Sequence, residues 1–470
     1  MAKKTKELSL EEKLEQALVP VDEQPYEVPE NWNQIYLKSV VSLGDGEKIA
    51  GEEHKYLEVK YLRGNKEPDI KDSGKYVEDG DYVILVDGEN SGEIFKLSES
   101  GYMGSTFKKL SISNKIDTDY ILYFIQQNKE FLRNNKKGSA IPHLNKELFG
   151  QLVLSLPPVE EQKRIVKAIE SMFAKLDEAK EIAEETLNSF EDRRAAILHK
   201  GFTGELTSSW REKRQPEDAA KYLAKIQEEA TGISRQDFKF WKNDSLPIGW
   251  CESKIGNLLY FAGRIGWKGL KADEYTEEGP FLLSVYNLND GDEVTYNRVY
   301  HITEERYEES PEIMVEIGDV LLTKDGAGIG KLGYVKELPQ KATINSSLLL
   351  IRPGEAAISK YVYYILSGPN LQRIVKERIT GSATPHLFQR DIKEFTIPVP
   401  SIEEQEKIVD VIDKMLEKEE RAKEVAETVI SSIDMMKKSI LAKAFRGELG
   451  TNIESEESSI ELLKSILQEV

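Results

Sequence analysis

The sequence predicts a mixed α+β chain built by tandem duplication, with two globular modules that are each followed by a long helix and then a short one. Three observations support this prediction. The stretch from Pro157 to Gly204 recurs from Pro400 to Gly447 without a gap, at a constant offset of 243 residues. Each copy carries apolar residues at alternating steps of four and three, which is the pattern of a heptad seam. The segments before the two copies share their ends and differ in their interiors.

The two long helices are predicted from the seam positions. In the first copy these are Ile165, Ile169, Met172, Leu176, Ala179, Ala183, Thr186, Phe190 and Ile197, with Arg193 inside the last step. In the second they are Ile408, Ile412, Met415, Ala422, Ala426, Val429, Ile433, Met436 and Ile440, with Glu419 as the one charged break. Each run of about 40 residues predicts a helix of roughly 60 Å. Neither helix could bury its apolar stripe alone, so we expect the two copies to pair.

The repeat also predicts the domain organisation. We expect an N-terminal helical segment (1–28), a first module (29–157), a central long helix (158–203), a linker with a short helix (204–245), a second module (246–400), a distal long helix (401–446) and a C-terminal tail with a short helix (447–470). Both module interiors are rich in β-branched and aromatic residues broken by Gly, Asn and Asp, and helical runs follow. Each module is therefore expected to be a mixed α+β domain.

Short landmarks recur in both modules. Trp32 matches Trp250 near the module starts, GDYVILVDG from Gly80 matches GDVLLTKDG from Gly318, and GSAIPHL matches GSATPHL near the module ends. His143 and His386, each inside its PHL, are expected to close the module against its helix. The offset between the copies grows from 218 to 238 to 243 along the modules, so the second module is the longer one.

Composition restricts the classes of protein that this chain can be. It has 470 residues, of which 39% are hydrophobic and 31% charged, as in a multidomain globular protein. We find no apolar run of 18 residues and no apolar signal region at the N-terminus, so no membrane partner is expected. The single Cys251 excludes an internal disulfide framework and a cysteine metal site, which fits a reducing cytoplasm.

Net charge disfavours non-specific binding to nucleic acid without excluding a local basic face. The formal charge is −19, but it is unevenly spread. From Asn31 to Gly150 there are 17 basic and 19 acidic residues, which is nearly neutral. Much of the acid lies in the N-terminal segment, the helices and the tail.

No catalytic constellation is found in the sequence. GAGIGKLG from Gly326 resembles a phosphate-binding loop, but a strand rather than a helix is expected after it, and Leu332 stands where such a loop needs Ser or Thr. A β-turn or DNA-facing loop is the better interpretation. The five His residues form no HExxH pair, so no metal site is expected.

The combination of motifs resembles the specificity subunit of a type I restriction-modification enzyme. The residues that carry the resemblance are LPPVEEQKRIV and VPSIEEQEKIV, the GFTGEL and AFRGEL that close the long helices, the paired GD…DG strands and the duplicated GSA-x-PHL. The resemblance covers nearly the whole chain. The N-terminal segment before Pro29 is longer than the family pattern, and the first module's DGENSGEIF departs from the commoner DGAGIGKLGYV form.

The resemblance implies a non-catalytic reader of double-stranded DNA. Each module would be a target-recognition domain for one half of a split, asymmetric sequence, and the two helices would pack antiparallel and set the distance between the modules, with pseudo-twofold symmetry. Two modification subunits would dock on the chain, and restriction subunits would join them. S-adenosylmethionine, ATP and Mg²⁺ would belong to these partners, so no cofactor is expected here.

Candidate DNA contacts are residues that can bind phosphate or read bases on loops that can approach the duplex. In the first module they are Lys48, Asn90, Ser91, Lys108, Lys109, Asn134, Lys136 and Lys137. In the second they are Arg264, Trp267, Lys268, Lys271, Thr323, Lys324 and Lys331. The alternative for each residue is a solvated turn.

A second function class stays open at this point. A coiled-coil adaptor whose two modules bind peptides or proteins would suit the acidic charge. Duplicated ends with divergent interiors favour the DNA reader, because that design changes the target while it keeps the docking surface.

Overall fold

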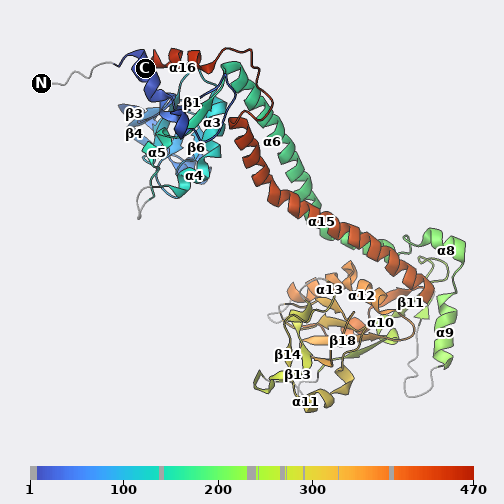
Figure 1. Cartoon of the computed structure of the whole chain (residues 1–470). Coiled ribbons are helices and arrows are strands. Elements are labelled where there is room, and N and C mark those ends of the chain that lie inside the picture. Colours follow the sequence, from blue (N-terminus) through green and yellow to red (C-terminus); the bar gives the residue numbers. More distant parts are fainter. Residues whose placement is uncertain are drawn as a thin grey trace. The chain divides into compact units, whose positions relative to one another are not determined.

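The computed structural model describes residues 8–136, 142–229, 240–241, 243–264, 270, 272–288, 292–326, 328–380 and 386–469. These form two compact units. Unit 1 comprises Met1–Glu184 and Thr428–Val470, and unit 2 comprises Glu185–Glu427. Each unit therefore holds one module, the first half of the long helix that follows it, and the second half of the other long helix (Figure 1).

Unit 1 contains the N-terminal helix, the first module and the C-terminal tail. Its strands are β1 (Asn33–Tyr36), β2 (Val41–Gly44), β3 (Glu47–Leu57), β4 (Asp69–Val77), β5 (Tyr82–Leu85), β6 (Ile94–Lys96), β7 (Gly101–Met103), β8 (Phe107–Ile112) and β9 (Val153–Leu156). Its helices are α1 (Leu10–Ala17), α2 (Val59–Leu62), α3 (Thr118–Gln127), α4 (Lys129–Asn134), α5 (Lys146–Gly150), α16 (Ser459–Leu467) and most of α6 (Val159–Asn188).

Unit 2 contains the end of the central helix, the linker and the second module. Its strands are β10 (Phe240–Trp241), β11 (Cys251–Lys254), β12 (Leu259–Ala262), β13 (Thr276–Leu283), β14 (Tyr300–His301), β15 (Val320–Thr323), β16 (Leu332–Tyr334), β17 (Ala342–Ile344), β18 (Leu348–Pro353) and β19 (Thr396–Val399). Its helices are α7 (Phe190–Phe202), α8 (Ser208–Arg214), α9 (Ala219–Glu229), α10 (Ile255–Leu258), α11 (Glu304–Glu308), α12 (Ser359–Ser367), α13 (Pro369–Thr380), α14 (Gln389–Lys393) and the first part of α15 (Ile402–Phe445).

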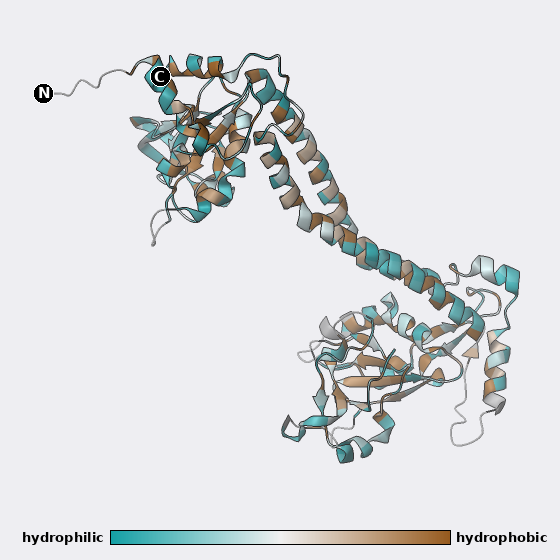
Figure 2. Cartoon of the chain, in the orientation of Figure 1, coloured by the Kyte–Doolittle hydropathy of each residue, from teal (hydrophilic) through white to brown (hydrophobic). Residues whose placement is uncertain are grey.

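Both modules contain the same four-stranded sheet. Its order is β2-β8-β5-β6 in unit 1 and β12-β18-β15-β16 in unit 2, and all neighbours are antiparallel. The repeated GD…DG segment supplies β5 and β15 inside this sheet. Val83, Ile84 and Leu85 of β5 are buried, as are all four residues of β15, and Figure 2 shows hydrophobic residues inside each module.

The two modules differ in a second sheet. In unit 1, β3, β4 and β7 close into a small barrel, whereas in unit 2 the strands run in the order β14-β13-β17. The predicted divergence of the interiors is therefore confined largely to one sheet, while the sheet that carries the GD…DG strand is common to both modules.

The long helices pair within each unit in the antiparallel sense that the resemblance implied. In unit 1, Lys437 lies 2.6 Å from Asp177, and Arg164 at the start of α6 reaches Thr451 just beyond the end of α15. Ile165 and Ile169 are completely buried at this end of the pair. The apolar stripes that the sequence predicts therefore do pack together.

In unit 2 the two charged residues that interrupt the seam are partners. Arg193 Nε donates to Glu419 Oε2 at 2.6 Å, and Gly201 of α7 lies against Ile412 of α15. Because the pair is antiparallel, each charged break faces the other break rather than an apolar side chain.

Two predicted seam positions are wrong, because Ala422 and Met436 of α15 are exposed. The exposed fraction of Met436 is 47%. The apolar stripe is therefore narrower along these turns of α15 than the heptad pattern predicts.

The first long helix differs from the predicted continuous helix. It is divided into α6 and α7 at Ser189, whose φ and ψ are −92° and 1°. The Ser189 hydroxyl donates to the Glu185 carbonyl at 2.6 Å, and such bonds to the carbonyl four residues earlier bend helices. The second copy lacks this break, because α15 is one helix of 44 residues.

The short helices occupy equivalent places at the base of each module. In unit 1 the C-terminal helix α16 packs against the N-terminal helix α1, where Lys13 Nζ donates to the Leu467 carbonyl at 3.3 Å. In unit 2 the corresponding helix α9 contributes Leu223, which is completely buried in the core of that unit. Leu463 of α16 is equally buried in the core of unit 1.

Candidate nucleic-acid interface

The turn after the GD…DG strand has the same backbone frame in both modules. It joins β5 to β6 in unit 1 and β15 to β16 in unit 2. The amide of Gly92 donates to the Leu85 carbonyl at 2.7 Å, and the amide of Gly330 donates to the Thr323 carbonyl at 2.9 Å. The first module's departure from the commoner sequence therefore leaves the path of the hairpin unchanged.

The side chains within this frame differ. Asn90 and Ser91 of the first module stand where the second has Gly328 and Ile329. Asn90 Oδ1 accepts from Arg133 Nη2 at 2.8 Å, so helix α4 holds the side chain of the loop. Ser91 and Ile329 are buried, so the difference between the two turns at the surface is Asn90 against Gly328.

The hairpin is supported by the segment just after α4 in unit 1 and by helix α13 in unit 2. In unit 1, Lys136 Nζ donates to the Glu89 carbonyl at 2.5 Å. In unit 2, Gln372 Nε2 donates to the Gly330 carbonyl at 3.2 Å, and Val375 lies against the Gly330 backbone. The loop is thus carried on a rigid scaffold rather than projecting freely.

Each hairpin turn is joined to the repeated PHL segment by an Asp-His pair. Asp87 Oδ1 lies 2.6 Å from His143 Nδ1, and Asp325 makes the matching bond with His386 Nδ1. Backbone bonds flank both pairs, since the amide that follows each histidine donates to a carbonyl of the hairpin, at Val86 and at Lys324. The prediction that these histidines close the module against its long helix is therefore wrong, because they fasten to the hairpin instead.

Several predicted lysines are already paired with carboxylates. Asp45 bonds both Lys108 and Lys75, with the Lys75 distance at 2.6 Å, and these bonds lower the pKa of Asp45 to about 2. Lys109 Nζ lies 2.6 Å from Asp81. A phosphate would have to compete with these carboxylates, so the charge available to DNA is smaller than a lysine count suggests.

Three predicted contacts are buried. Arg264 is 5% exposed and donates through Nε to the Ile344 carbonyl at 3.1 Å and through Nη2 to the Thr343 hydroxyl at 3.2 Å. Ser91 and Thr323 are completely buried. These side chains cannot reach DNA in this structure, because the hairpin frame and the sheet enclose them.

The other predicted residues divide into three sets. Lys48 on β3, Asn134 at the end of α4 and Lys331 after the second hairpin turn are exposed. Lys324 Nζ lies 2.9 Å from Asp325, beside the second Asp-His pair. Outside the described residues lie Lys137, Trp267, Lys268 and Lys271.

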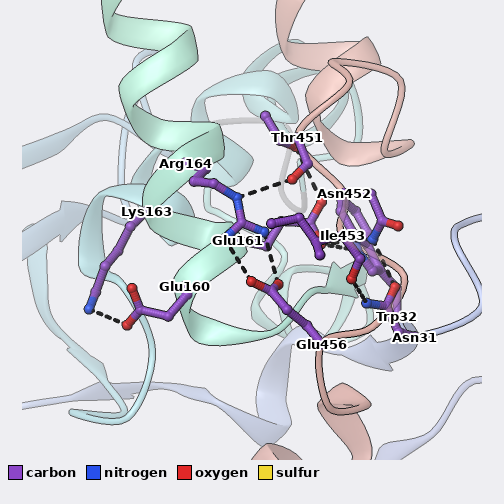
Figure 3. Close-up of polar contacts among 10 residues, drawn as sticks. All are labelled: Asn31, Trp32, Glu160, Glu161, Lys163, Arg164, Thr451, Asn452, Ile453 and Glu456. Atoms are coloured by element: carbon purple, nitrogen blue, oxygen red, sulfur yellow. Dashed lines mark hydrogen bonds and ion pairs between the residues drawn. The ribbon is translucent and has the colours of Figure 1, made fainter.

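A buried carboxylate fastens the start of each long helix to its module. Glu161 Oε2 accepts from Trp32 Nε1 at 2.7 Å and from Asn452 Nδ2 at 2.9 Å, and Oε1 accepts from the Thr451 hydroxyl at 3.2 Å (Figure 3). The glutamate is completely buried. It therefore joins three parts of the chain, which are the start of the module, the long helix and the tail.

The equivalent residue of unit 2 is Glu404. Its Oε2 accepts from Trp250 Nε1 at 2.8 Å, its Oε1 accepts from the Thr207 hydroxyl at 2.7 Å, and Arg211 Nη1 also bonds Oε1. Both landmark tryptophans thus point at the glutamate of the repeated EEQ motif. We call these two clusters the Glu161 joint and the Glu404 joint.

The glycine of each GEL motif lies against the same joint. Gly204 and Gly447 both have φ of +75°, in the left-handed region that favours glycine. A Cβ atom would lie 2.5 Å from Pro247 at Gly204 and 2.6 Å from Pro29 at Gly447. The close approach of the chain to a proline explains why the motif ends the helix with Gly.

Comparison with known proteins identifies the family. Residues 29–186 and 247–427, well over half of the chain, match the family described as the type I restriction modification DNA specificity domain. The chain belongs to this family. It is a specificity subunit of a type I restriction-modification system, with the specificity domain present twice.

Individual relatives agree with this assignment over most of their length. The type I restriction enzyme MjaVIII specificity subunit of Methanocaldococcus jannaschii is 25% identical over 441 residues, which cover 90% of this chain and 94% of the relative. The EcoBI specificity subunit of Escherichia coli is 25% identical over 406 residues, which cover 84% of this chain and 81% of the relative.

Solved structures show the same fold. The crystal structure of the HsdS subunit from Thermoanaerobacter tengcongensis aligns with a TM-score of 0.62 at 18% identity and covers 91% of this chain and 100% of that one. A second chain, from work on complex assembly and conformational transition of the type I R-M system, aligns with a TM-score of 0.58 at 18% identity and covers 90% of this chain and 100% of that one.

The role of the joint residues in this specificity subunit was not predicted from the sequence. Glu161 and Glu404 stand in the EEQ motif that marks the repeat, yet charge alone predicts an exposed first-turn residue there. The only available signal was that Trp32 and Trp250 recur together with the two glutamates. Gln162 and Gln405 of the same motif also act internally, as their side chains accept from the amides of Asp117 and Ile358 at 2.9 Å.

Within the described part of this specificity subunit, no group of three or more His, Cys, Asp or Glu side chains is placed to hold a metal ion. None of the described helices is both long enough and apolar enough to cross a membrane.

Proposed function

We propose that each module of this specificity subunit reads one half of a bipartite, asymmetric DNA sequence. The observation that carries the proposal is the hairpin after the GD…DG strand, which keeps one backbone path in both modules while Asn90 of the first stands where the second has Gly328. A shared frame suits a common way of approaching the duplex, and different side chains suit different base sequences. The exposed Lys48, Asn134 and Lys331 are the candidates for direct contacts that the structure leaves accessible.

An exchange of modules tests this proposal. Residues 32–155 are replaced with the corresponding segment of a relative, the hybrid is expressed with its modification subunit, and the methylated genome is sequenced. We expect one half-site to change and the other to remain. A change in both half-sites would contradict independent reading by the two modules.

We propose further that the paired long helices set the distance between the half-sites. Ala183 and Ala426 are repeat-related and almost fully buried, so a heptad inserted after each keeps the seam in register. Each insertion lengthens its helix by about 10 Å. At roughly 3.4 Å per base pair, the spacer should grow by about two or three base pairs, or affinity should fall because the DNA must twist. Full activity at the original spacing would contradict the proposal.

We propose that two modification subunits dock on the long helices. Ile182 and Val425 occupy equivalent positions in the two repeats and are 58% and 62% exposed. Exposed apolar side chains at these two positions are available for contact with a partner. A repeated position supports two copies of one partner. We expect Ile182→Glu or Val425→Glu to lower the number of bound modification subunits from two to one, as measured by native mass spectrometry.

The chain itself is proposed to lack catalytic activity. S-adenosylmethionine, ATP and Mg²⁺ would act on the modification and restriction subunits, and the complex would work in the cytoplasm. Purified alone, the chain should transfer no methyl group from S-adenosylmethionine to DNA. Methyl transfer by the purified chain that disappears when one of its own carboxylates is mutated would contradict this proposal.

A further inference from the structure

Within the described residues, the two Asp-His pairs are the only polar side-chain pairing that we find repeated at the hairpin turns of both modules. Asp87 holds His143, and Asp325 holds His386. The surrounding side chains differ between the modules, yet these pairs occupy the same place in the same frame. A shared function is a better explanation than chance, because the interiors otherwise diverge.

A contribution to folding stability does not account well for the two Asp-His pairs. The side chains of His143 and Asp87 are 53% and 33% exposed, and those of His386 and Asp325 are 37% and 34% exposed. Ion pairs at such exposed positions contribute little to stability. The flanking backbone bonds already hold the PHL segment on the hairpin. The imidazoles are therefore available for another role.

The geometry determines which ring nitrogen is available. In each pair the carboxylate accepts from Nδ1, which leaves Nε2 on the other side of the ring. No described residue bonds Nε2 of His143 or of His386. A ring with a proton on both nitrogens can donate Nε2–H to an anion while Nδ1–H stays bonded to the carboxylate.

We propose that His143 and His386 each bind a phosphate of the DNA backbone, one in each half-site. A base contact shared by both modules would require the same base at equivalent places in both half-sites. A phosphate is common to every sequence and can position both modules without restricting what they read. This inference rests on the proposed function, because it requires both modules to lie on DNA.

The charged groups beside the pairs are consistent with this role. In module 1 the segments packed against the pair carry Glu89 and Lys136. In module 2, Lys324 shares the Asp325 carboxylate, and Arg390 lies over the Phe388 ring, which contacts His386. In module 2 a phosphate at Nε2 would thus share its surroundings with the cation of Lys324, which bonds the same aspartate.

The test measures DNA binding by the complex of this chain with its modification subunit. His143→Gln and His386→Gln are compared with the unaltered complex on a duplex that carries the site found by methylome sequencing, between about 50 and 200 mM salt. We expect each variant to lose about tenfold in affinity, the size of one charge-assisted hydrogen bond.

The salt dependence provides a readout that a purely structural role would not change. Loss of one phosphate contact should lower the slope of log K against log salt by about 0.9. The control is His54→Gln, since His54 in module 1 is also paired with a carboxylate, Glu52, at 3.3 Å. His54 has no counterpart in the hairpin frame, so its variant should retain the affinity and the slope.

Three outcomes would overturn the inference. An unchanged affinity and salt slope in both variants would assign the pairs a structural role. Altered preference at one base pair with an unchanged slope would assign the imidazole to a base. If the unaltered complex itself binds no bipartite site, the proposed function fails together with the inference. If the unaltered complex binds such a site and the variants behave like it, only the inference about the histidines fails.

Discussion

The Glu161 joint and the Glu404 joint are built from the same repeat but use different chemistry. Glu161 is bonded by neutral donors from Trp32, Thr451 and Asn452. Glu404 is bonded by the neutral Trp250 and Thr207 and by the cationic Arg211, whose side chain is only 16% exposed. A buried carboxylate needs partners for its oxygens, and the two joints show that either kind of donor can meet this need.

The joints also differ in how their third segment is connected. In unit 2 that segment continues through the linker into the second module. In unit 1 it is the C-terminal tail, which the Arg164-Glu456 pair holds to the start of α6, with both nitrogen-oxygen distances at 2.8 Å (Figure 3). The Asn31 side chain adds a bond to the Ile453 carbonyl at 3.2 Å. The Glu161 joint therefore needs its own contacts to hold the tail.

The modules are also attached to their helices differently. In unit 2, Asp292 accepts from Arg194 Nη2 at 2.7 Å and from the Tyr363 hydroxyl at 2.6 Å. Burial and the neighbouring Asp292 raise the pKa of Tyr363 above its ordinary value, so it stays a donor throughout the usual pH range. In unit 1 the comparable link is the exposed pair of Lys438 and Glu130. Module 2 is thus held to its helix pair by the less exposed contact.

The largest expected effect comes from removing the tail. Deletion of residues 451–470 removes the completely buried Leu463 and leaves Glu161 with Trp32 as its remaining side-chain donor. We expect unit 1 to lose most of its stability, because removal of one buried leucine side chain alone lowers the free energy of unfolding by about 2 to 5 kcal/mol. Hydrogen exchange should show lost protection in unit 1 and retained protection in unit 2. Deletion of residues 468–470 is the control, and equal loss in both units would contradict the comparison.

The second effect distinguishes the chemistry of the joints. Glu404→Ala leaves the Arg211 cation without its buried partner. This should lower the free energy of unfolding by about 3 to 5 kcal/mol. Glu161→Ala removes an acceptor of neutral donors only, which should lower the free energy of unfolding by about 1 to 3 kcal/mol. Calorimetric unfolding of both variants measures which substitution lowers the free energy of unfolding more. The exposed Glu403→Ala serves as the control, and a larger cost at Glu161 than at Glu404 would show that donor charge does not decide the energetics.

A smaller effect is expected at the links between modules and helices. Asp292→Asn should destabilise unit 2 by about 1 kcal/mol, because solvent screens the charge of this carboxylate, whose side chain is 41% exposed. Glu130→Gln should give no measurable change in unit 1. Denaturant unfolding of the two variants tests the difference. Equal effects would mean that the Arg194 contact is no stronger than the exposed one.

The smallest effect concerns the lysines of module 1. Asp45→Asn should free Lys108 and Lys75, tighten DNA binding slightly and steepen its salt dependence by up to about one unit for each lysine that gains a phosphate. The pKa of Asp45 is about 2, below its ordinary value, so its contribution is present at higher pH and is lost only as pH falls through about 2. The effect of Asp45→Asn should therefore be the same at about pH 6 and pH 8.

The sequence by itself determined the tandem duplication, the heptad seams and the family, because these depend on spacing that the chain repeats. It indicated two charged breaks in the seams, but their pairing depends on the antiparallel register. Only the tertiary structure decided that Arg193 faces Glu419, that Arg264 is buried against Thr343, and that the repeated histidines meet the hairpin aspartates. These contacts join residues far apart in sequence, where local pattern carries no signal and packing between elements decides which side chains meet.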